Sequence, residues 1–254
     1  MVTLFCDLDN TLIYSHKRTL NTPKRVAEML NGKEQSYITE RTFDFLSSCN
    51  TVNVVPVTTR TLQQYERVKG TLENFNCRFA LILNGAVLIK DGIIDETWLA
   101  QSKELAKGAS QEMDRAVTLI ENSENVLIRY SDGLFAYATA PYPEMLSQQI
   151  KRTVDTSLVK LFFDNRKVYC VPQILSKGNA IKRLLNILES EQTLAVGDSN
   201  NDLSMFDNVD IPIVPCVLEA KVSNENKVVA SESEILSDAA CNVIEKLIEG
   251  SCNR

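Results

Sequence analysis

Residues 2–12 read VTLFCDLDNTL, an apolar run that ends in two aspartates one residue apart. The apolar part, residues 2–6, predicts a buried β-strand. In an extended chain the side chains of Asp7 and Asp9 project to the same side, a few ångströms apart. Their like charges repel, and one of them takes up a proton unless a cation lies between them. The stretch therefore predicts a strand whose end carries a cation-dependent site.

Both ends of the chain share one pattern, in which short apolar strands alternate with helices. The predicted strands are residues 52–57, 79–83, 194–196 and 211–214. The predicted helices are residues 39–48, 58–69 and 178–188, a helix that starts near residue 201, and a terminal helix. Residues 13–36 are polar and are predicted to be irregular. Continuous apolar strands that alternate with helices indicate a parallel α/β sheet.

The middle of the chain has a different pattern, in which hairpins replace single strands. A hairpin is predicted over residues 87–94, followed by a long helix over residues 97–121. Two further hairpins, residues 126–139 and 159–171, flank a helix at residues 144–157. Helix followed by hairpin thus occurs twice, which predicts a duplicated αββ unit with an antiparallel sheet. The expected organisation is a core domain of residues 1–84 and 176–254, interrupted by an inserted α/β domain of residues 85–175.

Composition excludes several classes of function. The chain has 254 residues with 27 Lys and Arg against 33 Asp and Glu, and its net charge of −6 disfavours binding to nucleic acid or to an anionic membrane. Its seven cysteines are scattered and form no CxxC pair, which is typical of reduced thiols in the cytoplasm. No signal peptide and no bilayer-spanning apolar run is visible, so a soluble cytoplasmic protein is expected. A single histidine, His16, excludes multi-histidine zinc sites.

Four polar clusters lie where predicted strands end or helices begin, the edge at which open α/β sheets bind ligands. They are Asp7 with Asp9, Thr58 with Arg60, Lys177, and the stretch GDSNND over residues 197–202. Carboxylates that converge on one edge suit a hard divalent cation such as Mg²⁺. A lysine at a helix N-terminus, as predicted for Lys177, is favourable if anions lie beyond that end. Thr58, at the predicted start of a helix, suits a phosphate-binding position.

These four clusters, in this order, resemble the motifs of the haloacid dehalogenase-like phosphatases. The matching stretches are DLDNTL, Thr58 in VTTR, Lys177 in SKGNAI, and GDSNND. The middle segment resembles the larger, C2-type cap of the Cof and sucrose-phosphate phosphatase branch. Asn10 stands where a glycine is common, and Thr59 where that branch often has glycine. The resemblance implies a Rossmann-like core domain with an inserted α/β cap domain.

The resemblance also implies a role for each matching residue. Asp7 is expected to be the nucleophile and Asp9 the general acid and base. Asp7, the backbone carbonyl of Asp9, and Asp198 are expected to hold Mg²⁺, with Asp202 as a further or water-mediated ligand. The phosphate-binding residues implied are Thr58, Lys177 and Asn201, with Asn201 also bracing its loop.

The expected function is a Mg²⁺-dependent phosphatase that forms an aspartyl-phosphate and acts on a small phosphorylated metabolite. A sugar or polyol phosphate as the substrate rests on the resemblance alone. Candidate substrate-contacting residues are Asn84, Arg129, Lys160 and Arg166. Two alternatives stay open: a phosphomutase similar to phosphomannomutases, and a noncatalytic binding module with the same fold. Turnover of a generic phosphate ester would exclude the noncatalytic module and leave the phosphatase and the phosphomutase.

Overall fold

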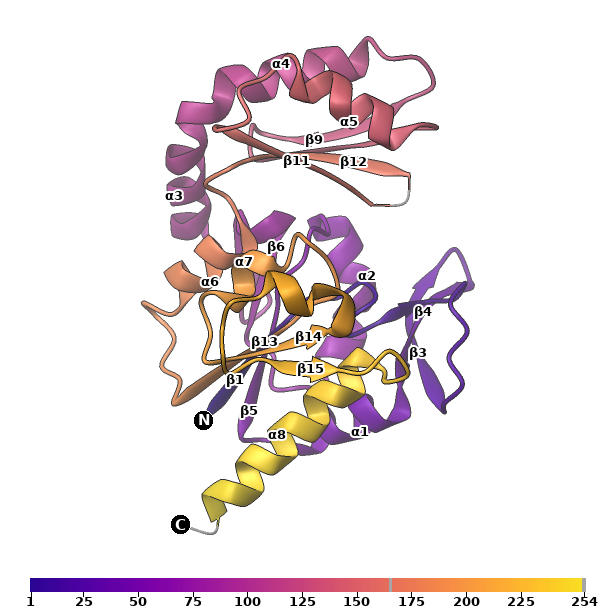
Figure 1. Cartoon of the computed structure of the whole chain (residues 1–254), viewed down its shortest axis with the longest axis vertical. Coiled ribbons are helices and arrows are strands. Elements are labelled where there is room, and N and C mark those ends of the chain that lie inside the picture. The colour runs from indigo at the N-terminus through magenta and orange to yellow at the C-terminus, as the bar shows by residue number, and fades with distance from the viewer. Residues whose placement is uncertain (165, 253–254) are drawn as a thin grey trace.

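The centre of the fold is a five-stranded parallel sheet in the order β15-β14-β13-β1-β5 (Figure 1). The computed structural model describes residues 1–164 and 166–252. The strands of this sheet are β1 (Val2–Cys6), β5 (Val52–Pro56), β13 (Gln192–Val196), β14 (Ile211–Pro215) and β15 (Val228–Ala230). Leu4 of β1 lies opposite Leu194 on one side and Val54 on the other. The two ends of the chain therefore build one sheet, which confirms the predicted fold class.

Adjacent residues of β1 face opposite sides of this sheet, because successive side chains of a strand alternate. Leu4 packs in a cluster with residues of α1 (Glu40–Ser48), α2 (Leu62–Leu72) and α8 (Leu236–Cys252). Phe5 packs in a second cluster with residues of α6 (Lys177–Leu184) and α7 (Leu203–Phe206). Both side chains are fully buried, and such burial stabilises a fold by about 1.5–3 kcal/mol per side chain. Helices on both faces thus hold β1 rigidly beneath the residues that follow it.

Residues 14–39 form a small antiparallel sheet, so the prediction of an irregular segment over residues 13–36 is wrong. Its strands are β2 (Tyr14–Ser15), β3 (Lys24–Leu30) and β4 (Lys33–Thr39), in the order β2-β4-β3. Strands β3 and β4 join at Asn31 and Gly32, whose φ angles of 52° and 73° suit a tight hairpin turn. Most side chains of β3 are exposed, so no apolar alternation marks the strand in the sequence. Strand β3 packs against α2, and the Thr71 hydroxyl donates a hydrogen bond to the Ala27 carbonyl at 2.9 Å.

Several predicted helices have different ends in the structure. The single helix predicted over residues 97–121 is α3 (Glu96–Ala106) and α4 (Ser110–Glu121), separated by the 3₁₀ turn η2 (Lys107–Ala109). Gly108 lies in that turn, and glycine disfavours a continuous helix. The helix predicted from residue 58 begins only at Leu62, with Thr61 as its N-cap. The helix predicted to reach residue 157 is α5 (Pro143–Lys151), and the helix predicted from residue 201 is the short α7.

A four-stranded antiparallel sheet in the order β11-β12-β10-β9 lies above the parallel sheet in Figure 1. Its strands are β9 (Leu127–Ser131), β10 (Phe135–Thr139), β11 (Val159–Asp164) and β12 (Lys167–Pro172). Helices α4 and α5 cover one face of it and share a separate hydrophobic cluster with its strands. The other face points toward the parallel sheet. The order α4-β9-β10 and α5-β11-β12 confirms the duplicated αββ unit.

A further three-stranded sheet, β6-β7-β8, connects these two parts of the chain. Strand β6 (Phe79–Ile82) continues through the 3₁₀ turn η1 (Leu83–Gly85) and pairs with β7 (Val87–Lys90), which pairs with β8 (Ile93–Ile94). Trp98 of α3 packs in the same cluster as Phe5 and donates a hydrogen bond to the Gly85 carbonyl at 3.1 Å. Residues 87–98 therefore lie against the parallel sheet. The predicted domain boundaries at residues 84 and 175 stay a prediction.

Two further observations concern the chain as a whole. Within residues 1–164 and 166–252, no helix combines the length and the apolar character that crossing a bilayer requires. The six cysteines whose side chains the structure describes are free thiols. A disulfide framework among them is thereby excluded, in agreement with their scattered spacing. The remaining 3₁₀ segment, η3 (Cys216–Lys221), follows β14 and borders the site described next.

Candidate active site

Asp7 and Asp9 lie at the carboxyl end of β1, on a tight loop. The Asp7 backbone N–H donates to the Val196 carbonyl at 3.0 Å, which ties the loop to β13. Asn10 has a φ of 62°, a left-handed conformation that asparagine and glycine adopt more readily than other residues. This explains why Asn10 can stand where a glycine is common. The loop buries the Asp7 side chain and leaves that of Asp9 about half exposed.

Asp7, Asp198 and Asp202 form an acidic cluster in which one carboxylate oxygen of each lies within 4.8 Å of the others. Asp198 and Asp202 follow β13, the neighbour of β1, so the parallel register brings the two loops together. Three carboxylates at this spacing are a donor set that suits a hard divalent cation such as Mg²⁺. The structure thus brings the carboxylates of Asp198 and Asp202 to Asp7, whereas the Asp9 side chain pairs with Arg60. Metal binding by these carboxylates and by the Asp9 backbone carbonyl stays a prediction.

Lys177 is the buried cation of this cluster. Its Nζ donates to Asp7 Oδ1 at 2.5 Å and to Asp202 Oδ1 at 2.6 Å, and its side chain is 2% exposed. Burial acts to lower the pKa of Lys177, but Asp202 and Asp7 outweigh it and hold the pKa above its ordinary value. Burial and the charges of Asp202 and Asp198 raise the pKa of Asp7, against the opposing effect of Lys177. Because the pKa of Asp7 lies above its ordinary value, its ionised, nucleophilic form depends on positive charge beyond that of Lys177.

Asp202 is anchored by donors of its own loop. Its Oδ2 accepts hydrogen bonds from the Ser199 backbone N–H at 2.9 Å and from the Ser199 hydroxyl at 2.7 Å. A Cβ at Gly197 would lie 2.5 Å from the Asp202 Cβ, so this loop requires glycine there. Asp202 is fully buried and both its oxygens have protein donors. It thus holds Lys177 in place, and its role as a metal ligand stays a prediction.

Asn84, Asn201 and Lys160 come together beside this cluster. The Asn201 amide donates to Asn84 Oδ1 at 2.8 Å, and Lys160 Nζ donates to Asn201 Oδ1 at 3.0 Å. The Asn84 amide donates to the Leu175 carbonyl at 2.8 Å. Burial lowers the pKa of Lys160. Lys160 belongs to β11, so this contact joins the four-stranded sheet to the loop that carries Asp198 and Asp202.

Thr58 does not lie at a helix N-terminus, so that part of its prediction is wrong. Helix α2 begins at Leu62, and residues 58–61 form an extended connection. Thr58 is buried and its hydroxyl accepts a hydrogen bond from the Arg60 backbone N–H at 3.2 Å. Thr59 and Arg60 are the residues of this connection that line the cavity. A phosphate-binding role for Thr58 stays a prediction that now depends on the motif alone.

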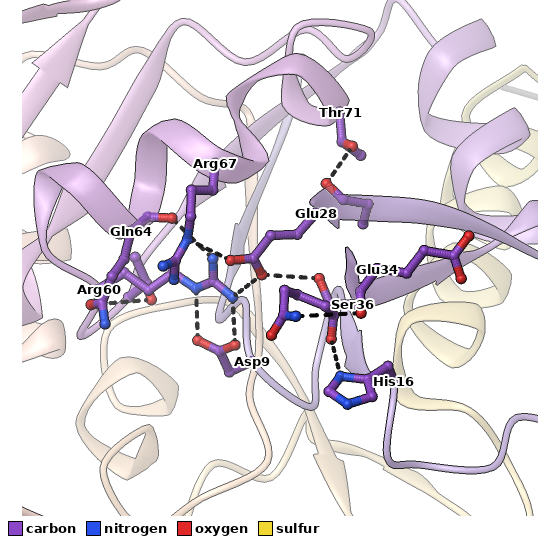
Figure 2. A network of polar contacts seen from close by, with 12 residues as sticks. Asp9, His16, Glu28, Glu34, Ser36, Arg60, Gln64, Arg67 and Thr71 are labelled. Atoms are coloured by element: carbon purple, nitrogen blue, oxygen red, sulfur yellow. Dashed lines mark hydrogen bonds and ion pairs between the residues drawn. The ribbon is translucent and has the colours of Figure 1, made fainter. Parts of the chain in front are cut away.

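Figure 2 shows a polar network around Asp9 that no sequence pattern predicted, in which Arg60 and Glu28 are buried. Arg60 donates from Nε to Asp9 Oδ2 at 2.9 Å and from Nη2 to Asp9 Oδ1 at 2.7 Å. The same Nη2 also donates to Glu28 Oε2 at 2.9 Å. Glu28 Oε1 makes an ion pair with Arg67 Nε at 2.7 Å, and the Ser36 hydroxyl donates to Oε2 at 3.1 Å. Glu28 thus anchors, through Arg60, the carboxylate expected to act as acid and base.

The pKa of Asp9 reflects this network. Burial acts to raise it, but Arg60 outweighs that effect with help from the charges of Lys167 and Lys177, and the pKa lies below its usual value. The lowered pKa favours ionised Asp9, the form that acts as a general base, whereas donation of a proton requires Asp9 to be protonated first. The sequence does contain one signal for the strands that carry Glu28 and Ser36. The Asn31-Gly32 pair predicts a hairpin turn, and therefore a strand on either side of it.

These residues border a cavity of about 1530 Å³ between the parallel sheet and the open face of the four-stranded sheet. Asp7, Asp9, Asp198 and Lys177 line it from one side. The other side consists of residues of β10, β11, β12 and their turn: Tyr137, Thr139, Lys160, Leu161, Phe162, Phe163, Arg166, Lys167 and Tyr169. Arg166 lines this cavity, and its contact with the substrate stays a prediction. Arg129 is exposed on β9, is not part of the described lining, and donates to the neighbouring Ile128 carbonyl.

The family model of the haloacid dehalogenase-like hydrolases matches residues 53–215. The chain belongs to this family. A phosphoglycolate phosphatase of Sulfurisphaera tokodaii is 29% identical over 141 residues, which are 52% of this chain and 53% of that relative. The matched part thus spans about half the length of the relative. The matched range includes Thr58, Lys177 and the GDSNND stretch, and membership of the family confirms the stated resemblance.

Solved structures of this family share the fold over nearly the whole chain. The sucrose-phosphatase of Synechocystis sp. PCC6803, solved with sucrose and phosphate, has a TM-score of 0.65 at 16% identity and covers 96% of this chain and 97% of its own. A sugar phosphatase of subclass IIB has a TM-score of 0.67 at 12% identity and covers 96% and 99%. At these identities the likeness establishes the fold, with its Rossmann-like core and its antiparallel cap sheet.

Proposed function

We propose that this protein is a Mg²⁺-dependent phosphatase that hydrolyses monoesters of a small phosphorylated metabolite. The observation that carries the proposal is the Asp7 carboxylate, held 2.5 Å from Lys177 in an acidic cluster at the mouth of a large cavity. The phosphatase names of the relatives support the reaction, and the sugar-phosphatase names support a sugar or polyol phosphate as the substrate.

In the first step, an Asp7 carboxylate oxygen attacks phosphorus as the bond to the leaving alcohol oxygen breaks. Asp9 delivers a proton to that oxygen, and the phosphoryl group stays on Asp7 as an acyl-phosphate. Lys177 lies beside Asp7 and offers positive charge to the phosphoryl oxygens. In the second step, water attacks phosphorus, Asp9 accepts its proton, and Asp7 is released as a carboxylate.

Asp7, Asp198 and the backbone carbonyl of Asp9 would hold Mg²⁺, with Asp202 as the further ligand. The fit rests on the three carboxylate oxygens within 4.8 Å of one another. When bound, Mg²⁺ supplies positive charge that offsets the repulsion between these carboxylates and the phosphoryl group. The chain's own contribution is the geometry: Ser199 fixes Asp202, and Asp202 fixes Lys177.

We further propose that residues 85–175 act as a cap that closes over the cavity and selects the substrate. The contact between Lys160 and Asn201 supports a cap that reaches the catalytic loop. Closure would exclude water from the phosphoryl-transfer step. Lys160 and Arg166 stay candidates for contact with the substrate because they line the cavity. Asn84 acts through Asn201, and Arg129 carries no support from its position.

The test is a screen of phosphorylated metabolites with Mg²⁺ that measures both free phosphate and isomerised product. Release of phosphate by the wild type, and none by Asp7→Asn, supports the proposed reaction. Isomerised product without net phosphate release identifies a phosphomutase instead. Absence of turnover for every ester, including p-nitrophenyl phosphate, refutes the enzymatic proposal and favours a noncatalytic binding module.

A further inference from the structure

The cavity wall beyond the catalytic carboxylates is strongly cationic. Ten Lys and Arg side chains line the cavity, of which Arg60, Arg67 and Lys177 pair with carboxylates. The other seven make no ion pair with a carboxylate that the structure describes. They are Lys17, Arg18, Lys151, Lys160, Arg166, Lys167 and Lys221. Such a concentration contrasts with the net charge of −6 of the whole chain.

These cations converge from separate elements. Lys17 and Arg18 follow β2, Lys221 ends η3, and Arg166 and Lys167 lie at the turn into β12. Cations that share one cavity repel one another unless anions are present. A phosphoryl group bound at Asp7 would carry two negative charges and would lie beside Lys177. Two of these seven cations would be enough to balance its charge. The others therefore remain available for a different anionic group of the ligand.

Aromatic side chains line the cavity together with part of these cations. The rings of Phe162 and Tyr169 stack with centroids 4.8 Å apart, and the Tyr137 ring lies 5.9 Å from Tyr169. Lys160 Nζ lies 5.5 Å from the Phe162 centroid, and Lys167 Nζ lies 5.3 Å from the Tyr137 centroid. An apolar surface with cations at its borders suits a compact organic body that carries charge at its periphery.

We propose that the alcohol part of the substrate carries an anionic group of its own, a second phosphate or a carboxylate. Its scissile phosphoryl group lies at Asp7, its body lies on Tyr137, Phe162 and Tyr169, and its second anion binds Arg166 and Lys167. This inference rests on the proposed phosphatase activity and specifies its substrate class. Charge-assisted hydrogen bonds to that anion contribute affinity that a neutral alcohol group cannot provide.

The test compares matched esters that differ in one anionic group. Fructose 1,6-bisphosphate is compared with fructose 6-phosphate, and 3-phosphoglycerate with glycerol 3-phosphate. The first pair tests a second phosphate and the second pair tests a carboxylate. Assays of kcat/KM use Mg²⁺ and about 0.15 M salt, at which the Debye length of about 8 Å screens long-range attraction. Calorimetric Kd values for the same compounds, measured with the Asp7→Asn variant as well as with wild type, give binding without hydrolysis.

We expect the anion-bearing member of at least one pair to have the higher kcat/KM and the lower Kd, by about 10-fold or more. Lys167→Gln and Arg166→Gln should remove most of that difference, because kcat/KM should fall more for the anion-bearing member of the pair than for its neutral partner. Lys246→Gln, an exposed lysine of α8 far from the cavity lining, is the matched control.

Each outcome separates the two proposals. Turnover of p-nitrophenyl phosphate with equal constants within both pairs overturns the second-anion inference and leaves the phosphatase proposal intact. The same holds if a difference within a pair persists in both glutamine variants, because the anion then binds elsewhere. Tighter binding of the anion-bearing members without turnover of any ester supports the anion site and refutes the phosphatase proposal.

Discussion

The Glu28→Gln variant tests whether the hairpin of β3 and β4 supports the acid-base residue. The substitution keeps the shape of the side chain and removes its charge. Glu28 is 4% exposed and contacts two arginines, Arg60 at 2.9 Å and Arg67 at 2.7 Å. Removing one partner of a buried ion pair costs about 3–5 kcal/mol, because the remaining charge stays buried. The side-chain amide oxygen of glutamine still accepts one hydrogen bond, so we expect a loss of about 3 kcal/mol.

Thermal unfolding followed by circular dichroism measures this loss. For a chain of this size, 1 kcal/mol changes Tm by about 2–4 °C, so Tm should fall by about 6–12 °C. The matched control is Glu34→Gln, an exposed carboxylate on β4 that accepts a hydrogen bond from Tyr37. Substitutions at such positions change stability by about 0.5 kcal/mol or less. Arg67→Gln should cost less than Glu28→Gln, because Arg67 is 29% exposed and can bind water.

The same variant has a kinetic consequence. Arg60 holds both oxygens of Asp9, and without Glu28 the orientation of Arg60 is less restricted. We expect kcat to fall more for an alkyl phosphate, whose leaving group needs a proton, than for p-nitrophenyl phosphate. If Glu28→Gln has the Tm of the Glu34→Gln control, the buried ion pairs do not stabilise the hairpin. If both esters are affected equally, Glu28 does not act through Asp9.

Further predictions concern the reaction and the packing beneath it. Asp7→Asn should show no acyl-phosphate in acid-quench mass spectrometry, whereas Asp9→Asn should retain it and lose about 10²–10⁴ in turnover of alkyl esters. A phosphorylated Asp7→Asn protein would disprove the assignment of the nucleophile. Chelator should abolish phosphate release and Mg²⁺ should restore it. Asp198→Ala should need a higher Mg²⁺ concentration than wild type to release phosphate. Activity that chelator does not change would contradict the metal site. Gly178→Ala should lower Tm, because the new Cβ would lie 1.9 Å from the Ser204 carbonyl oxygen. Gly70→Ala is the control: it lies on an exposed turn of α2 with nothing within 4 Å, and should raise stability by about 0.5–1 kcal/mol. Equal melting temperatures of the two variants would argue against the tight contact of α6 with α7.

Local patterns in the sequence determine the fold class and the centre of the site. Asp7 and Asp198 each follow an apolar strand, and the carboxyl ends of parallel strands meet at one edge. Their approach therefore depends only on the two strands being parallel neighbours. The duplicated αββ unit is predictable for a similar reason, since the period of apolar residues changes along the chain from helix to strand.

Tertiary structure alone decides which side chains orient Asp9. Arg60 lies 51 residues from Asp9 and 32 residues from Glu28, and no local pattern links the three. Most side chains of β3 are exposed to solvent, so its strand is invisible to a search for apolar alternation. Tertiary contacts also decide where helices begin. The Thr58 backbone N–H donates to the Leu81 carbonyl and the Thr58 carbonyl accepts from the Asn84 N–H, so residue 58 is not helical and α2 begins at Leu62.

For the four-stranded sheet at the cavity, too, the sequence predicts one part and the tertiary structure decides the other. That the middle segment forms a separate antiparallel sheet follows from the sequence, because hairpin turns and apolar alternation act between near neighbours. The register places Lys160 and Arg129 on the same face of that sheet, and only the tertiary structure turns this face toward the catalytic loops. Lys160 on the edge strand β11 reaches Asn201, whereas Arg129 on the opposite edge strand β9 remains exposed. A shift of one residue in strand register would exchange these faces. The polar side chains of a strand do not specify which face turns toward the catalytic loops. The packing of α4 and α5 against the opposite face specifies it.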